Sequence, residues 1–413
     1  MMRSMSVAIA ALRNHQVYMD VVSSNISNVN TTGFKASRIS FQELLSQTLR
    51  GSSAPRGGIG GLNPVQIGLG VALGGIDTLF SQGSLQDTGK LTDLAIQGDG
   101  FLILDNGENG YVYTRDGNLD VGIDGSLLNL ATGMKVMGWQ ADEVTGQIDT
   151  SQALDEIVIP FGQSMARATS VMNMGGNLDA EAIAGDTGRS TIGVYDSLGV
   201  LHSIDITYTK TATDNQWTWT ASPSVTPSSL SITPSGTTIT FEPDGSFSST
   251  NPATELTIDF GNGSNTSVVS LDFSNVTQLM GLSNVSAASQ DGLSPGSLST
   301  FTVGSAGEVT GLFSNGLTRS LGQIGMANFT NPGGLVKEGQ SLFVVSANSG
   351  TPQVGMPGQE GRGQIAAGYL EMSNVELAQQ FTSMITAQRG FQANSRVITT
   401  SDEMLQELVN LKR

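Results

Sequence analysis

The two ends of this chain carry the residue spacing of paired helices, and this feature constrains the fold more than any other. Near the start, seam positions alternate spacings of three and four residues for more than three heptads, as in a coiled coil. They are Met5, Ala8, Leu12, His15, Met19, Val22, Ile26 and Val29. The sequence Thr31-Thr32-Gly33 ends the pattern. Residues 1–30 are therefore predicted to form a helix that packs on another helix.

A second helical stripe lies at the other end of the chain. Its apolar positions repeat every seven residues, and Phe381 and Ile385 widen it; they are Leu377, Met384, Phe391, Ile398 and Leu405. Ser373 and Glu376 have the spacing of a capping box, which predicts that the helix begins at Ser373. Gly390 lies near the middle, where Gly costs about 1 kcal/mol relative to Ala. It marks a close approach, a bend or a tolerated residue.

Neither helix has a helical partner close by in the sequence. The simplest arrangement pairs the two ends with each other and with other copies of the chain. The predicted inner helical domain therefore comprises residues 1–30 and 372–413. Gly-rich connecting linkers are predicted at residues 31–71 and 352–371, because Gly and Pro clusters favour loops or extended backbone.

The middle of the chain shows strand patterns. Ile204, Ile206 and Tyr208 alternate with polar residues, as expected for half-buried antiparallel strands. Short apolar runs separated by turn residues predict an inner β domain at 72–168 and 299–351, and an outer β domain at 169–298. The predicted fold class is α+β multidomain, with terminal helices forming a coiled-coil inner domain, plus two mainly antiparallel β domains.

Composition excludes several kinds of chemistry. The chain has no cysteine, which excludes disulfides, zinc thiolate sites and cysteine nucleophiles. His15 and His202 are its only histidines and lie far apart in the sequence, which argues against a multi-histidine metal site within one chain. Gly83 to Lys90 misses the spacing of a phosphate-binding loop. Carboxylates are plentiful, so a glycosidase pair stays open, although nothing in the sequence singles one out. We predict no enzyme, no catalytic residue, no metal and no cofactor.

Charge and hydropathy limit the possible partners. The net charge of −17 argues against nucleic acid, whose binding needs a basic surface. No apolar run approaches the roughly 18–20 residues of a membrane helix, so no membrane partner is predicted. Met1 to Leu12 has an Arg before a short apolar run, but the helical pattern continues past Arg13. A cleaved leader has no reason to continue it, so we expect no cleaved signal peptide.

Two segments carry a family resemblance. Ser23 to Lys35 reads SSNISNVNTTGFK, and Ser373 to Ile398 reads SNVELAQQFTSMITAQRGFQANSRVI. Both resemble signatures of the flagellar rod and hook family, in which the first stretch turns the chain after a helix and the second is a long inner helix. Asn side chains suit such a turn, because they can cap carbonyls and accept left-handed backbone. The residues in question are Asn25, Asn28 and Asn30.

Other segments fit the same family. Gln82 to Gly89 and Leu94 to Phe101 look like its inner-domain segments, and Gly199 to Trp219 is similar to the outer domain of its hook members. The resemblance implies a structural subunit of the hook that polymerises into a curved, flexible, hollow tube and transmits torque from rod to filament. Contacts between outer domains are expected to be polar and hydrated, since a dry apolar interface would resist sliding.

The resemblance also implies partners and a location. Both termini would line the tube, with subunit contacts at Met5, Leu12, Met19, Asn25, Ile26, Asn28, Asn30, Leu377, Met384, Phe391, Ile398 and Leu405. The implied partners are other copies of the chain, the distal rod and hook–filament junction proteins, the hook cap and the flagellar type III export apparatus. The implied location is extracellular, in the hook and basal body of the flagellum.

Two alternatives stay open. The large insertion near 170–298 favours the hook, whereas the long Gly-rich segment from Gly51 to Gly75 resembles a distal rod protein of the same family. A secreted β-rich adhesin with helical ends is the alternative from another class. Assembly distinguishes these classes, because a filament subunit polymerises and an adhesin does not.

Overall fold

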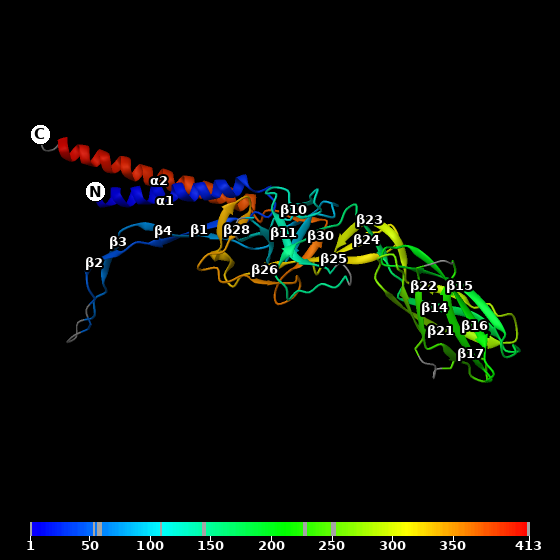
Figure 1. The fold of residues 1–413 in the computed structure, drawn as a ribbon. Helices are drawn as coiled ribbons and strands as arrows, with labels where there is room; N and C mark the ends of the chain where they lie inside the picture. The colour runs from blue at the N-terminus through cyan, green and yellow to red at the C-terminus, as the bar shows by residue number, and fades with distance from the viewer. Residues whose placement is uncertain are drawn as a thin grey trace. The chain divides into compact units, whose positions relative to one another are not determined.

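The chain begins and ends with a helix, with mainly antiparallel β-structure between the two in sequence order, and the two helices lie next to each other in Figure 1. The computed structural model describes residues 2–52, 54–55, 60–107, 110–142, 146–225, 229–248 and 253–410. It has two compact units. The first comprises Met1–Ile159, Thr302–Thr310 and Ser320–Arg413, and the second comprises Pro160–Phe301 and Gly311–Arg319. The predicted fold class is confirmed: helices at both ends, and mainly antiparallel sheets between them.

The helices are α1 (Met2–Ser27) and α2 (Leu377–Asn410), and they pack side by side (Figure 1). They run antiparallel: the Asn25 side chain reaches Gln380, while His15 lies against Gly390. Among the described residues, neither helix is long and apolar enough to cross a membrane.

Residues predicted as linkers form paired strands. Between residues 31 and 78, β1 (Ser37–Glu43) pairs with β4 (Val71–Thr78), and β2 (Ser46–Arg50) pairs with β3 (Val65–Gly68). Part of the Gly51–Gly75 segment, namely Ser53 and residues 56–59, lies outside the described residues. Near the second helix lie β29 (Gln353–Gly355), β30 (Gln364–Ala367) and β31 (Tyr369–Glu371). Ladder hydrogen bonds to β6 (Leu94–Gln97) and β5 (Leu85–Asp87) make β30 and β31 part of the folded body.

Aromatic side chains fill the β core of the first unit. Phe101, Phe329 and Phe343 lie buried together, and the Phe101 ring centroid is 5.8 Å from that of Phe329 and 5.7 Å from that of Phe343. The other strands of this unit are β5 (Leu85–Asp87), β6 (Leu94–Gln97), β7 (Phe101–Asp105), β8 (Tyr111–Thr114), β9 (Leu119–Val121), β10 (Leu127–Asn129), β11 (Lys135–Gln140), β12 (Asp155–Glu156), β26 (Met326–Asn328), β27 (Val336–Gly339) and β28 (Leu342–Val344), with a 3-10 helix at Pro332–Gly334.

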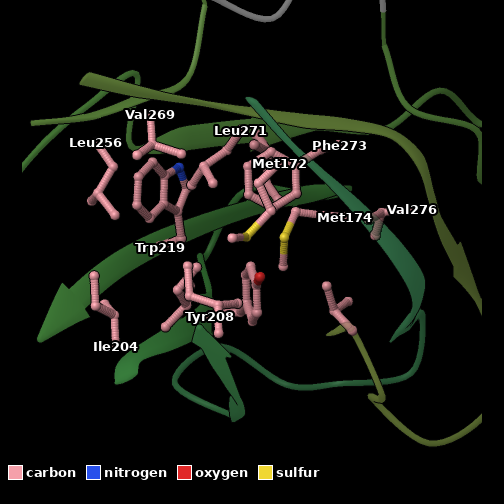
Figure 2. Packing of buried hydrophobic residues seen from close by; sticks show 14 of the residues in the cluster. Met172, Met174, Ile204, Tyr208, Trp219, Leu256, Val269, Leu271, Phe273 and Val276 are labelled. Carbon is pink, nitrogen blue, oxygen red and sulfur yellow. The ribbon is translucent and has the colours of Figure 1, made fainter. Parts of the chain in front are cut away.

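The second unit holds two sheets, with strand orders β18-β20-β21-β14-β22 and β15-β16-β17-β19. Its core is a cluster of large apolar side chains that includes Tyr208, Trp219 and Phe273 (Figure 2). Its strands are β13 (Ser164–Arg167), β14 (Val171–Asp179), β15 (Thr187–Tyr195), β16 (Leu201–Lys210), β17 (Gln216–Pro223), β18 (Ser231–Ser235), β19 (Thr238–Thr240), β20 (Glu255–Asp259), β21 (Ser267–Leu279) and β22 (Ser286–Gln290). Strands β23 (Leu293–Val303), β24 (Glu308–Phe313) and β25 (Thr318–Ile324) have residues in both units.

One pairing in the second unit departs from the antiparallel pattern. Strand β14 runs parallel to β21, from Val171 opposite Ser270 to Asp179 opposite Leu279. Residues 169–298, predicted as the outer β domain, lie within this unit. Alternation of apolar and polar residues predicts which side chains are buried, but it cannot distinguish a parallel from an antiparallel neighbour.

Candidate assembly site

The two terminal helices meet along a line of small side chains. Ala8 of α1 and Ala387 and Ser401 of α2 are buried, and Gly390 lies between the last two in the sequence. A Cβ added at position 390 would lie only 2.6 Å from His15 Cε1. Gly390 is therefore a close-approach residue, which decides among the three interpretations that the sequence left open. The prediction that His15 lies in the seam is confirmed by the same contact.

The predicted seam residues lie at different depths in the pair. Those of α1 are half-buried: Met5, Leu12, Met19 and Ile26. In α2, Met384, Ile398 and Leu405 are also half-buried, but Leu377 and Phe391 are 41% and 37% exposed. Because Ala387, Gly390 and Ser401 occupy the centre of the contact, the larger residues are displaced to its sides.

An apolar surface on α2 is left uncovered by α1. It consists of Leu377, Phe381, Ile385 and Phe391, which fall on one side of the helix at 3.6 residues per turn. Phe381 and Ile385 are 51% and 58% exposed. We call these four residues the α2 flank. Neighbouring large apolar side chains on a helix favour burial against a further partner.

Asparagine side chains hold the turn after α1, as predicted, but the backbone of these residues does not adopt the left-handed conformation that was also predicted. Asn25 is buried; its side chain donates to the Ser37 carbonyl at 2.8 Å and accepts from the Ser37 amide at 2.9 Å. Asn28 donates to the carbonyl of Ser24 at 2.9 Å, whereas Asn30 is exposed. The expected left-handed backbone at these asparagines is wrong.

The left-handed position of this turn is occupied by Gly33 instead. Its φ is 64°, and a Cβ there would lie 2.6 Å from the backbone nitrogen of Asp116. A side chain would thus be excluded by the β core as well as disfavoured by the backbone conformation. The Gly33 amide donates to the carbonyl of Glu371 at 2.8 Å.

Helix α2 begins four residues later than predicted. It starts at Leu377, and the Ser373 hydroxyl accepts from the amide of Val375 at 3.3 Å, so no capping box forms. Asn374 explains the difference, because its side chain holds the preceding segment extended. Its oxygen accepts from the amide of Ala36 at 2.8 Å, and its nitrogen donates to the carbonyl of Leu79 at 2.8 Å.

A buried ion triad joins the segments next to the two helices. Lys35 Nζ lies 2.6 Å from Glu371 Oε1, and Arg115 Nη1 lies 3.3 Å from Glu371 Oε2. The side chains of Lys35 and Glu371 are fully buried, and that of Arg115 is 2% exposed. Burial lowers the pKa of Lys35, while the adjacent Glu371 carboxylate opposes that shift.

The triad was missed in the sequence, although Lys35 ends the Asn-rich segment and Glu371 lies just before Ser373. Lone charged residues beside Gly and Asn are ordinarily exposed, and only tertiary pairing makes their burial tolerable. No group of three or more His, Asp or Glu residues with the geometry to hold a metal occurs in the part of the chain that the structure describes.

The second unit exposes apolar side chains at two opposite ends of its sheets. One end, which we call the β21 end, carries Leu279, Met280 and Leu282, of which Met280 and Leu282 are 78% and 89% exposed. The other end, which we call the β15 end, carries exposed Leu198, Val200 and Leu201. Strand register separates the two ends. Asp179, the last residue of β14, pairs with Leu279 at one end. Tyr195, the last residue of β15, pairs with Leu201, and its amide donates to the Thr169 hydroxyl just before β14 begins, at the other end. The sequence predicts polar, hydrated contacts between outer domains, and that prediction did not anticipate these exposed apolar side chains.

Four family models match the chain. "Flagella basal body rod protein" matches residues 5–35, and "Flagellar hook protein FlgE/F/G D1 domain" matches 95–175. "Flagellar basal body protein FlaE D2 domain" matches 167–293, and "Flagellar basal body rod FlgEFG protein C-terminal" matches 366–411. Together they span both terminal segments and both units.

Whole-chain relatives give the same result. The flagellar hook protein FlgE of Borreliella burgdorferi is 39% identical, and that of Treponema pallidum is 37% identical, each over 100% of both chains. The flagellar basal-body rod protein FlgG of Bacillus subtilis is 33% identical, also over 100% of both chains.

Proposed function

The chain belongs to the flagellar hook protein family, and we infer that it is a structural subunit of the hook of a bacterial flagellum. The full-length similarity to hook proteins carries this conclusion. The family is structural and not enzymatic, so the prediction that the chain is no enzyme is confirmed. The family also implies self-polymerisation and a location in the hook and basal body.

We propose that the terminal helices assemble the hook through the α2 flank. In a single chain, α1 covers the small residues of α2 and leaves Leu377, Phe381, Ile385 and Phe391 exposed. Burying such side chains contributes about 25 cal/mol per Å² of apolar surface, which favours packing against the helices of neighbouring copies. The other predicted contact residues support this surface because they hold α1 and α2 together. They lie between Met5 and Ile26 in α1 and between Met384 and Leu405 in α2.

We further propose that successive second units contact each other head to tail. The β21 end with Met280 and Leu282 and the β15 end with Val200 and Leu201 are two different apolar surfaces on one unit. Contacts between unlike surfaces that do not close into a ring generate open helical filaments. Polar strand faces beside these ends leave room for the hydrated contacts expected from the sequence.

The more specific partners follow from the family. We propose that the hook contacts the distal rod at one end and the hook–filament junction proteins at the other, and grows beneath a hook cap. Passage to the outside through the flagellar type III apparatus, without a cleaved signal peptide, completes the proposal. The absence of cysteine suits a chain that is exported unfolded.

Two observations favour the distal rod alternative: the long Gly-rich segment from Gly51 to Gly75, and the 33% identity to a rod protein over the whole chain. A deletion strain tests the two functions. If the chain is a hook subunit, isolated basal bodies of the strain will have complete rods and no hook under electron microscopy. Basal bodies with truncated rods would contradict the hook assignment and favour the distal rod.

A further inference from the structure

We propose that Glu371 is a positioning residue that couples the docking of the two ends of the chain to the β body. It lies in β31, just before α2, yet its nearest cationic partner, Lys35, follows α1 and is 336 positions away in the sequence. A contact between segments so distant in sequence can make the placement of each end depend on the other.

The charge balance of the triad creates this dependence. Two cations, Lys35 and Arg115, share the single carboxylate of Glu371 in a buried site. If the C-terminal segment leaves, Lys35 and Arg115 remain as like charges, with Asp99 as a further acidic group that influences both electrostatically. A buried charge without its partner is strongly unfavourable, so the segment that carries Lys35 would leave as well.

Backbone groups transmit the same dependence. The Glu371 carboxylate also accepts from the amide of Gly83 at 2.9 Å, and Lys35 donates to the carbonyl of Ser81 at 2.9 Å. One Glu371 side chain thus satisfies groups from the N-terminal segment and the body together. Since coupling between two docking events is reciprocal, docking of the N-terminal segment must strengthen docking of the C-terminal segment by the same factor.

The consequence concerns assembly competence. A chain with one end displaced would not retain the other end in place, and neither helix would find its partner in the pair. Only chains with both ends docked would present the α2 flank on a paired helix. This device discriminates against partly folded or truncated copies, and it requires no additional protein.

The absence of native cysteine allows a direct test on the full-length monomer. A thiol introduced by Ala36→Cys, at a residue 4% exposed, reports undocking of the N-terminal segment through its rate of alkylation. We expect Glu371→Gln to raise that rate at least tenfold. The matched control is Asp77→Asn, which breaks the exposed Arg38–Asp77 pair in the same region and should change the rate less than twofold.

A second variant separates charge balance from simple loss of packing. Adding Lys35→Met to Glu371→Gln removes one of the two unpaired cations, so alkylation should become slower than in Glu371→Gln alone. A packing role would instead make the double variant more reactive. A second thiol, from Ala327→Cys in the fully buried core, must stay protected in Glu371→Gln, which shows that the β body remains folded.

Three outcomes would overturn the proposal: an alkylation rate at position 36 unchanged by Glu371→Gln, a double variant more reactive than Glu371→Gln, or a thiol at position 327 that loses protection together with position 36. Each measurement is made on the monomer. Failure of this proposal is therefore distinguishable from failure of the proposed function, which is tested by electron microscopy of hooks and polymers.

Discussion

Gly390 of α2 lies against the ring of His15 in α1, with no space for even one added carbon atom between them. A Cβ at position 390 would be 2.6 Å from His15 Cε1 and 2.7 Å from Nε2. This one contact sets how closely the antiparallel helices approach. It explains why a residue that weakens an isolated helix occupies the middle of α2.

Replacing Gly390 with Ala should therefore separate the helices. Ala is the better helix former, yet we expect a loss of about 1–3 kcal/mol, as in other overpacked contacts. Thermal unfolding of the helix pair followed by circular dichroism measures it. The second substitution His15→Ala should restore part of the lost stability. An increase in helix stability in Gly390→Ala alone would contradict the close-approach interpretation.

Charged residues in the helix seam should disrupt the pair. Leu12→Asp and Met384→Asp each place a carboxylate at a half-buried position, which costs several kcal/mol when it is desolvated without a partner. We expect loss of helical signal while the tryptophan fluorescence of the folded second unit is retained. The control is Gln388→Asp, on the exposed side of α2, which should leave the helical signal unchanged.

Acid should weaken the second unit through Asp196. Burial alone would raise the pKa of this carboxyl, but hydrogen bonds from His202, Asn262 and the amides of Val200 and Leu198 outweigh burial and lower it below 3.8. The stabilisation is therefore fully present above pH 3.8 and is lost as pH falls through the lower, folded-state pKa.

Asp196→Asn should remove that part of the pH dependence. Asp196 Oδ2 now accepts hydrogen bonds from His202 and Asn262, and the amide nitrogen of the variant would place a donor against these two donors. We expect a lower melting temperature than wild type near neutral pH, and a difference that shrinks toward pH 2. The exposed control Asp214→Asn should show neither effect. A difference that does not vary with pH would argue against this role of Asp196.

Removal of most of the second unit should leave assembly intact and change tube shape. Arg167 of β13 pairs with Leu293 of β23, so a two-residue Asn-Gly turn in place of residues 168–292 can join them as a hairpin. We expect electron microscopy to show tubes that are straight or altered in curvature. A folded but wholly unassembled protein would mean that the second unit builds the tube and does not merely shape it.

Periodicity predicted the large features of this fold and failed where side chains act over long sequence distances. The heptads at both ends and the alternation from Ile204 to Tyr208 correspond to α1, α2 and β16. The start of α2 was placed at Ser373 because the capping-box spacing is local, whereas Asn374 bonds to Ala36. No local pattern contains that partner.

The contact residues show the same limit. Heptad spacing identified Leu377 and Phe391, but it could not indicate that Ala387 and Gly390 occupy the centre of the helix contact and leave the larger residues exposed. The triad of Lys35, Arg115 and Glu371 was beyond prediction for another reason. Its members come from three distant segments, and their pairing depends on strand positions that a single sequence does not specify.

The central claim is that the chain polymerises through terminal helices whose apolar flank is exposed in the monomer. Phe381→Asp tests it most directly. Phe381 is 51% exposed in the single chain, so we expect a charge there to leave the single chain folded. The measurement is electron microscopy of concentrated protein beside wild type. We expect hollow tubes from wild type, and folded monomer without tubes from Phe381→Asp. Tubes of equal abundance from the variant, or none from wild type under conditions that keep it folded, would contradict the claim.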